Sequence, residues 1–188
     1  MAVSQVAKLV ALQHNCTRGG QVLEGVQEMA VRRAADIVLI HEPKGTNEKD
    51  STCSHPNFSF IRGEETVPAK CWIAVNRVSK CQVMELKNLA AGTANHIQVV
   101  EVTTPSCEAI IIAIVYDRHA GNENNQPAQL TAWGEIAQHK RVIVARDMNA
   151  HSKMWNPSTT RPRNNTFWEQ VIQLHDLVVW NQRKRQGW

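Results

Sequence analysis

Polar side chains that can bind or move protons follow directly after several apolar runs of the sequence. Asn15 follows the first of these runs, Glu42 the second and Tyr116 a later one, and Asp147 and Asn149 follow the last. Short apolar runs of this kind are typical of buried strands, and ligands usually bind at the carboxyl ends of strands in α/β sheets. One polar residue after a strand is ordinary, because a strand must end in something polar. The prediction of a site therefore rests on the whole set.

The chemistry that these residue types can share is hydrolysis of a phosphodiester. Glu42 offers hard anionic oxygens that suit Mg²⁺, which takes few protein ligands, and Asn15 can hold the metal or a phosphate oxygen without adding charge. Asp147 can hold or deprotonate the attacking water, with Asn149 on the same side of an extended segment. Tyr116 can donate a hydrogen bond to a nonbridging oxygen as negative charge develops there.

The elements that must position these residues alternate between strands and helices. The pattern predicts helices over 22–30, from Pro127 past Ile136, and from about residue 165 onward, and strands over 6–13, 35–40, 71–75, 82–86, 97–102, 109–116, 142–145 and 177–180. Residues 44–69 are polar and predict mostly loop, and the four strands from 71 to 116 predict an antiparallel meander. We therefore expect an α/β fold, a four-layered α/β sandwich of two mixed β-sheets packed face to face and flanked by helices.

Bulk properties limit the class of protein without deciding it. The 188 residues suit one domain, 1–188, and a net charge of +4 permits a polyanionic partner without requiring one. Five scattered cysteines without a CxxC pair indicate reduced thiols in an intracellular protein rather than disulfides or a zinc site. No signal peptide and no membrane-spanning apolar run is evident, so no membrane partner is expected. A short basic cluster at 183–185 suits a nuclear signal, although such a cluster is more often just a solvated end.

Four short motifs in this order resemble the endonuclease/exonuclease/phosphatase superfamily. They are LQHN at 12–15, ADIVLIHEP at 35–43, VY at 115–116, and DMNAHS at 147–152 with Trp155. The last run is similar to the GDFNAHH..W pattern of endonuclease domains in non-LTR (LINE-type) retrotransposons, whereas phosphatases and abasic-site nucleases usually lack its His and Trp. The resemblance covers nearly the whole chain and implies the same sandwich fold.

Carried over to this sequence, the resemblance implies a role for each residue of the set. Glu42 would bind Mg²⁺ (or Mn²⁺), with Asn15 as an auxiliary metal or phosphate ligand. Tyr116 would contact the scissile phosphate, Asp147 would activate water and Asn149 would steady the transition state. In that family the domain nicks target DNA and leaves a 3′-hydroxyl that primes reverse transcription, so DNA is the expected partner, and the chain would once have been fused to a reverse transcriptase domain.

Three departures from the family pattern bear on activity. Arg146 replaces the usual Gly before the motif-four Asp, and we expect it to pair with Asp147 and crowd the metal site. Ile114 stands where Asn is common. The superfamily also ends on a Ser-Asp-His motif whose Asp and His form an acid/base pair, and no Ser-Asp-His occurs in this sequence. We therefore expect a sandwich that is incomplete at the C-terminus and weak or inactive in cleavage.

The histidines present do not clearly replace the missing pair. His175 and Asp176 are adjacent, but their place at a helix end favours a connecting role. His14, His41 and His119 lie near the predicted site edge, and each is read as an incidental polar loop residue.

Residues that could contact nucleic acid are fewer. Trp155, in the loop after motif four, is the candidate for base stacking, whereas Trp72, Trp133 and Trp168 fall on apolar faces and predict core packing. Arg161 and Arg163 suit phosphates and a solvated loop equally well. Two alternatives to a working endonuclease therefore remain: a non-catalytic retrotransposon remnant, and a phosphatase-type member of the superfamily.

Overall fold

The structure is a computed structural model of the chain, and strands dominate the part that it describes. It describes residues 8–16, 20–43, 55–63, 70–90, 97–105, 107–116, 132–139, 141–147, 152–154, 157–161, 166–175 and 177–179. The elements are β1 (Ala11–Asn15), α1 (Gly20–Arg32), β2 (Ile37–His41), β3 (Phe58–Ile61), β4 (Cys71–Asn76), β5 (Gln82–Glu85), the 3₁₀ helix η2 (Lys87–Ala90), β6 (Ile97–Thr104), β7 (Cys107–Tyr116), β8 (Val142–Asp147) and α3 (Thr166–Leu174).

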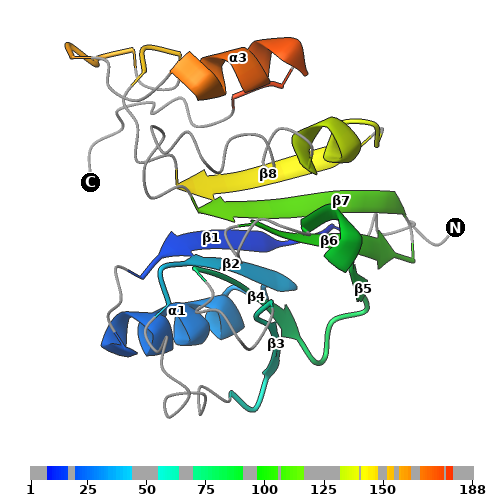
Figure 1. Ribbon diagram of the computed structural model, residues 1–188. Helices are drawn as coiled ribbons and strands as arrows, with labels where there is room; N and C mark the ends of the chain where they lie inside the picture. The colour runs from blue at the N-terminus through cyan, green and yellow to red at the C-terminus, as the bar shows by residue number, and fades with distance from the viewer. Residues whose placement is uncertain are drawn as a thin grey trace, which may run out of the picture.

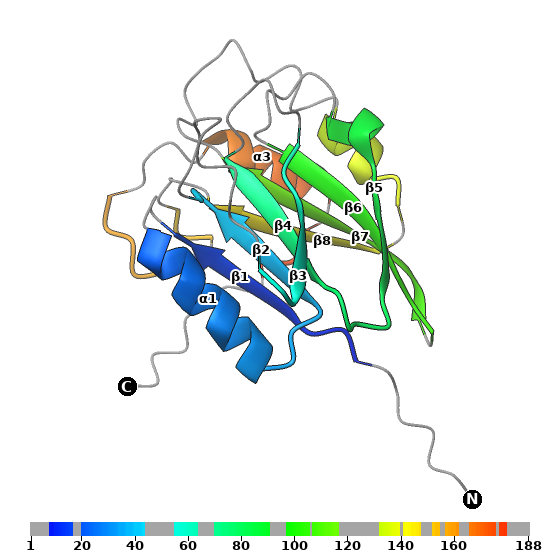
Figure 2. The same ribbon diagram turned by 90° about the horizontal axis from the view of Figure 1, so that it is seen from below.

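The first sheet has the strand order β1-β2-β4-β3. Its β1 and β2 run parallel and are joined through α1, and β4 is antiparallel to both of its neighbours. Helix α1 covers the outer face of this sheet, as Figure 2 shows, because Leu23, Val26 and Ala30 recur at helical spacing and are buried against it. The predicted strand–helix–strand unit at the start of the chain is confirmed.

The second sheet has the order β5-β6-β7-β8. Its first three strands form the antiparallel meander that the sequence predicts, and β8 adds parallel to β7. Of the four strands predicted for that meander, the first in the chain, β4, lies instead in the first sheet. A helical stretch over 132–136, whose Trp133 and Ile136 are buried, and helix α3 both pack on the outer face of this sheet.

The two sheets pack face to face, with helices on both outer sides (Figure 1). Apolar side chains from both sheets form the layer between them, including Leu39, Ile73, Val100 and Ile112. A second cluster lies under α1, and a third lies under the 132–136 helix and α3. The four-layered α/β sandwich predicted from the sequence is therefore the observed fold.

One short strand was not predicted, and one predicted strand was wrong. Within 44–69, predicted as mostly loop, Phe58–Ile61 form β3, in which alternation buries Phe58 and exposes Ser59 on an otherwise polar stretch. The described part of the predicted strand 177–180 is not a strand, because the Leu177 amide donates back to the Ile172 carbonyl and Val178 stays 79% exposed. The start of the helix predicted at Pro127 lies outside the described residues. None of the described helices is long and apolar enough to cross a membrane.

Candidate functional site

The strand ends that carry the predicted site residues meet at one end of the sandwich (Figure 1). In the first sheet, Asn15 is paired with His41, the residue before Glu42. In the second sheet, Tyr116 is paired with Asp147 at the parallel ends of β7 and β8. The backbone therefore places Asn15 and Glu42 on one sheet, and Tyr116 and Asp147 on the other.

Three hydrogen bonds from side chains to main-chain carbonyls join the two sheets at this end. The amide Nε2 of Gln13 donates to the Arg146 carbonyl at 3.1 Å, and Nε2 of Gln98 donates to the Cys71 carbonyl at 2.6 Å. The ring Nε2 of His41 lies 3.1 Å from the Val115 carbonyl. Because Arg146 and Val115 directly precede Asp147 and Tyr116, these bonds bring the strand ends of the two sheets to the same place.

Glu42 and Asn15 lie together on the first sheet. The Asn15 amide nitrogen is 3.5 Å from Oε1 of Glu42, and both side chains are half-buried. Glu42 has a backbone φ of 47°, a left-handed conformation that costs a non-glycine residue about 1–2 kcal/mol. Its amide donates to the Lys70 carbonyl at 2.9 Å, which helps to hold the turn. Strained backbone at a carboxylate that faces the site end is typical of functional positions.

These two side chains fit a magnesium ion. A carboxylate and an amide oxygen are hard donors, and Mg²⁺ commonly takes only one or two carboxylates and keeps several waters. Among the described residues no group of three His, Cys, Asp or Glu side chains forms a richer metal site. The donor set therefore suits Mg²⁺ or Mn²⁺ rather than a closed zinc centre.

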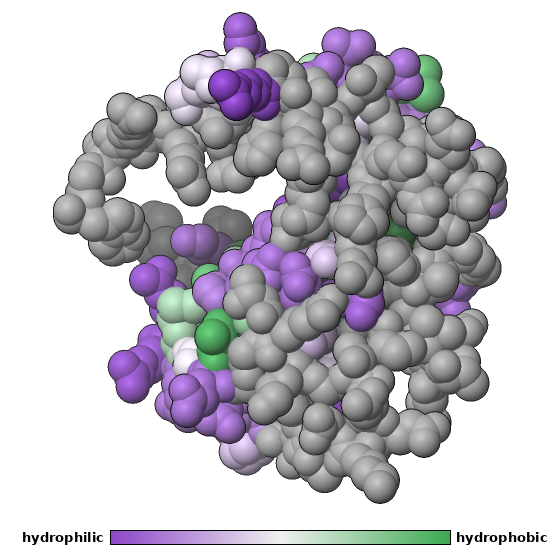
Figure 3. Space-filling model, turned by 60° about the vertical axis from the view of Figure 1, so that its left-hand side comes forward, coloured by the Kyte–Doolittle hydropathy of each residue, from purple (hydrophilic) through white to green (hydrophobic). Residues whose placement is uncertain are grey.

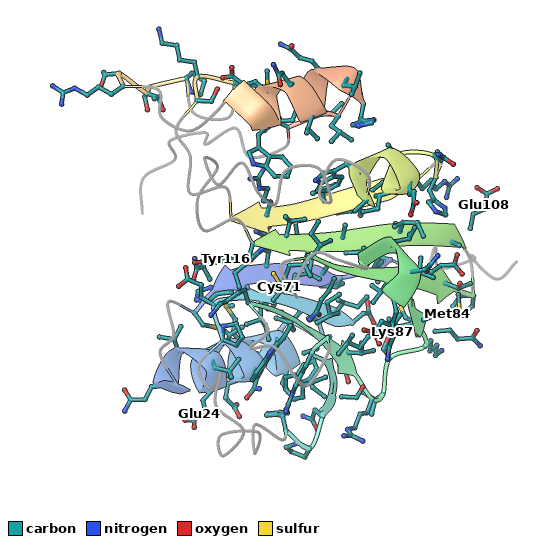
Figure 4. The ribbon with its side chains drawn as sticks, in the orientation of Figure 1. Glu24, Cys71, Met84, Lys87, Glu108 and Tyr116 are labelled. Carbon is teal, nitrogen blue, oxygen red and sulfur yellow. The ribbon has the colours of Figure 1, made fainter. Side chains whose placement is uncertain are left out.

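On the second sheet, the Tyr116 side chain is 3% exposed and packs in the layer between the sheets. Figure 4 shows it near Cys71, between the strands of the two sheets. The backbone of Asp147 lies beside it, while the Asp147 side chain lies outside what the structure describes. Asn149, Trp155 and Arg163 also lie outside the described residues, and Arg161 is exposed. The described surface that faces forward in Figure 3 is mostly hydrophilic.

Arg146 does not lie where the sequence placed it. Its guanidinium carbon lies over the ring of Trp168 in α3, on the outer face of the second sheet, where Val144 also packs. Because side chains alternate along a strand, residue 146 and residue 147 belong to opposite faces of β8. The expectation that Arg146 crowds the metal site is therefore wrong; its side chain joins β8 to α3.

A second contact joins α3 to Ser152, the last residue of the DMNAHS motif at 147–152. The buried Ser152 hydroxyl donates to the carboxylate of Glu169 and accepts a hydrogen bond from the Met154 amide at 3.0 Å. Trp168 and Glu169 thus contact residues 146 and 152, which bracket the segment carrying Asp147 and Asn149. The sequence did not predict this role of α3, although Ser152 belongs to the DMNAHS motif from which the site was predicted.

The histidines fall in different places. His41 is fully buried in β2 rather than in a loop, so the interpretation of it as an incidental loop residue was wrong. The alternation of Ile37 and Leu39 toward the other sheet could have indicated this, because His41 continues the same face. His14 is half-buried in β1, so the loop interpretation of it was wrong as well, and His175 lies in the turn that ends α3. His119 and Asp176 lie outside the described residues.

Comparison with solved structures places this geometry in a known fold. The chain aligns with the endonuclease domain of TRAS1, a telomere-specific non-LTR retrotransposon, with a TM-score of 0.69 and 21% identity over 89% of this chain and 71% of that one. It also aligns with the AP endonuclease LMAP of Leishmania major (TM-score 0.64, 10% identity, 87% of this chain and 65% of that one). The chain has the endonuclease/exonuclease/phosphatase fold. The resemblance predicted from the four motifs is confirmed at this level.

Other neighbours show how broadly this fold is used. The 3′ phosphatase NExo from Neisseria, bound to a product DNA hairpin, aligns with a TM-score of 0.57 and 14% identity over 89% of this chain and 71% of that one. No protein-family model matches the sequence, and no curated protein matches it. At these identities the likeness shows the fold, and the activity must be argued from the site.

Cys16, directly after Asn15, gives a testable consequence of burial at this end. Burial raises the pKa of the Cys16 thiol from 9.0 to about 11. The folded chain thus holds this proton more tightly than the unfolded chain, so the contribution of Cys16 to stability is complete below about pH 9 and is lost as the pH rises to about 11. Urea unfolding at several pH values should show a shallower alkaline loss of stability in Cys16→Ala. An identical pH dependence in both proteins would contradict this account.

Proposed function

We propose that the chain is a Mg²⁺-dependent phosphodiesterase-type domain that acts on DNA, like the nicking endonuclease of non-LTR retrotransposons. The observation that carries the proposal is the meeting of strand ends from both sheets, with Asn15 and Glu42 on the first sheet and Tyr116 and Asp147 on the second. The TRAS1 endonuclease domain, which has the same fold, supports the choice of an endonuclease. The AHS..W run after Asp147 favours this class over a phosphatase.

In this proposal each residue has one task. Glu42 and Asn15 hold the metal, which when bound supplies positive charge beside the phosphate oxygens. The Tyr116 hydroxyl donates a hydrogen bond to a nonbridging oxygen of the scissile phosphate. Asp147 accepts the proton of the attacking water, and Asn149 donates to the same phosphate as its charge grows. Arg161 and Arg163 contact the DNA backbone and Trp155 stacks on a base.

The 188 residues contain no Ser-Asp-His, so the proposed activity of this chain alone is weak or absent. Loss of one member of a catalytic unit commonly costs several orders of magnitude in rate. A non-catalytic retrotransposon remnant is therefore the second candidate. The likeness to the 3′ phosphatase NExo keeps a phosphatase-type activity as a third.

The test measures two substrates side by side with Mg²⁺. Conversion of supercoiled plasmid to the open circle reports nicking, and release of phosphate from a 3′-phosphorylated duplex reports the phosphatase alternative. We expect slow nicking at most, and any nicking should disappear in Asp147→Ala. Phosphate release without nicking would replace the endonuclease proposal. Equal residual activity in Asp147→Ala would mean that another protein or another residue causes it.

A further inference from the structure

The inner layer of the sandwich changes character toward the site end. In the middle and at the far end it is filled by side chains such as Leu39, Val102 and Ile112. At the site end this layer continues with Cys71, Ile114 and Tyr116, and two buried polar side chains, Gln98 and His41, also lie there. A polar group in such a place is costly unless it is hydrogen-bonded, so its partner constrains how the two sheets sit.

Of the three hydrogen bonds that join the sheets at this end, the one made by His41 lies next to both Glu42 and Tyr116 in the chain. Its side chain is 0% exposed, and its Nε2 lies 3.1 Å from the Val115 carbonyl. A carbonyl oxygen can only accept, so Nε2 carries the hydrogen in this contact. In the chain, His41 precedes Glu42 and Val115 precedes Tyr116. The hydrogen bond between His41 and Val115 therefore crosses between the sheets one residue before Glu42 on the first sheet and one residue before Tyr116 on the second.

Apolar packing alone does not set this geometry. Facing sheets pack about 10 Å apart, and interdigitated aliphatic side chains hold that separation without a directional bond. A hydrogen bond is directional and weakens steeply when its angle or length departs from the optimum. The bond from His41 thus restricts the sliding of the first sheet over the second at the strand ends that carry Glu42 and Tyr116.

We infer that His41 is a positioning residue that sets Glu42, on the first sheet, in register with Tyr116, on the second. This inference rests on the proposed function for its consequence in catalysis, but the positioning itself can be measured without activity. His41 touches neither metal nor phosphate in this account. Its loss should therefore leave Mg²⁺ affinity unchanged and should weaken only a ligand that spans both sheets.

The composition of the chain supplies a direct probe. Tyr116 is the one tyrosine in the sequence, so labelling with 3-fluorotyrosine gives a single ¹⁹F resonance that reports its surroundings. We expect one narrow line in the unsubstituted chain. His41→Leu, which keeps an apolar side chain but has no donor, should shift the line and broaden or split it. His41→Gln, which retains an N–H donor for the Val115 carbonyl, should restore a line close to the original.

The matched control is Val102→Ala. Val102 is fully buried in the same layer but at the other end, so its truncation lowers stability through lost packing without touching the bond. Urea unfolding identifies the conditions under which both variants are equally folded. An unshifted, narrow line in His41→Leu would overturn the inference, and so would the same broadening in Val102→Ala.

A binding experiment separates this inference from the proposed function. With Mg²⁺ present, His41→Leu should bind a fluorescent duplex at least about tenfold more weakly than the unsubstituted chain, with Mg²⁺ affinity by calorimetry unchanged. If neither protein binds the duplex while the ¹⁹F line still changes, the proposed function fails and the positioning role stands. If both bind equally and the line is unchanged, the positioning role fails and the proposed function stands.

Discussion

Glu42→Gln is expected to lower the Mg²⁺ affinity of the chain by about 100-fold or more, because even indirect contacts to a bound metal are worth 10–100-fold. The glutamine keeps the size of the side chain and loses the charge that a hard cation requires. The free energy of unfolding should stay within about 0.5 kcal/mol, since a half-buried residue at a strand end contributes little packing. Calorimetric titration with Mg²⁺ and urea unfolding measure the two quantities.

The backbone of Glu42 allows a sharper version of this experiment. Its φ of 47° favours glycine, so Glu42→Gly should also lose Mg²⁺ binding but should raise stability by about 1 kcal/mol. Glu24, an exposed glutamate on α1, is the control, because Glu24→Gln removes the same charge away from the site. Unchanged Mg²⁺ affinity in Glu42→Gln would remove Glu42 as the ligand. A large loss of stability in Glu42→Gly would show that its side chain supports the fold.

Local patterning predicted the part of the site that depends on strand ends. Asn15, Glu42 and Tyr116 follow apolar runs, and a run of that kind forms a strand wherever it can be buried on both faces. Parallel pairing of β1 with β2 and of β7 with β8 then brings their ends to one edge. The positions could thus be predicted from the sequence, while the roles of these residues remain proposals.

The contacts that hold the site together could not be predicted, because each joins residues far apart in the chain. The His41 ring reaches Val115, and Gln13 reaches the carbonyl of Arg146. Such bonds depend on how the two sheets stack, which is set by the shapes of many core side chains together. The alternation of apolar residues along a strand shows which face of the strand is buried. It does not show which carbonyl a buried polar side chain will contact.

Arg146 shows that a contact between residues adjacent in the sequence is also hard to predict. Next to Asp147 in sequence, it was expected to pair with that carboxylate. Trp168, more than twenty residues later, offers a ring face on the outer side of β8, and the guanidinium stacks there instead. Neighbours in a strand point to opposite faces, so sequence adjacency was a poor guide to contact. The departure from the family's glycine is thereby explained by packing against α3.

This placement reverses one expectation about restoring activity. From the sequence alone, Arg146→Gly should rescue a little nicking by uncrowding the metal site. From the structure it should lower stability by about 1–3 kcal/mol, since it removes the cation–π contact and the packing of the arginine stem and adds a glycine to a strand. Arg161→Gly, at an exposed arginine, is the stability control and should change little. Urea unfolding of both variants decides between the two expectations.

The largest gain in activity should come from a different change. Appending a family-type C-terminal segment that carries Ser-Asp-His to the 188 residues should raise plasmid nicking by orders of magnitude, because it supplies the acid/base pair that these residues lack. Adding Arg146→Gly to the extended chain should then lower activity, since β8 loses its contact with α3 beside Asp147. Conversion of supercoiled to open-circular plasmid measures each variant, with Asp147→Ala as the blank. Robust nicking by the unextended chain, abolished in Asp147→Ala, would instead mean that a residue already present, such as His175 or His119, performs the work assigned to the missing pair.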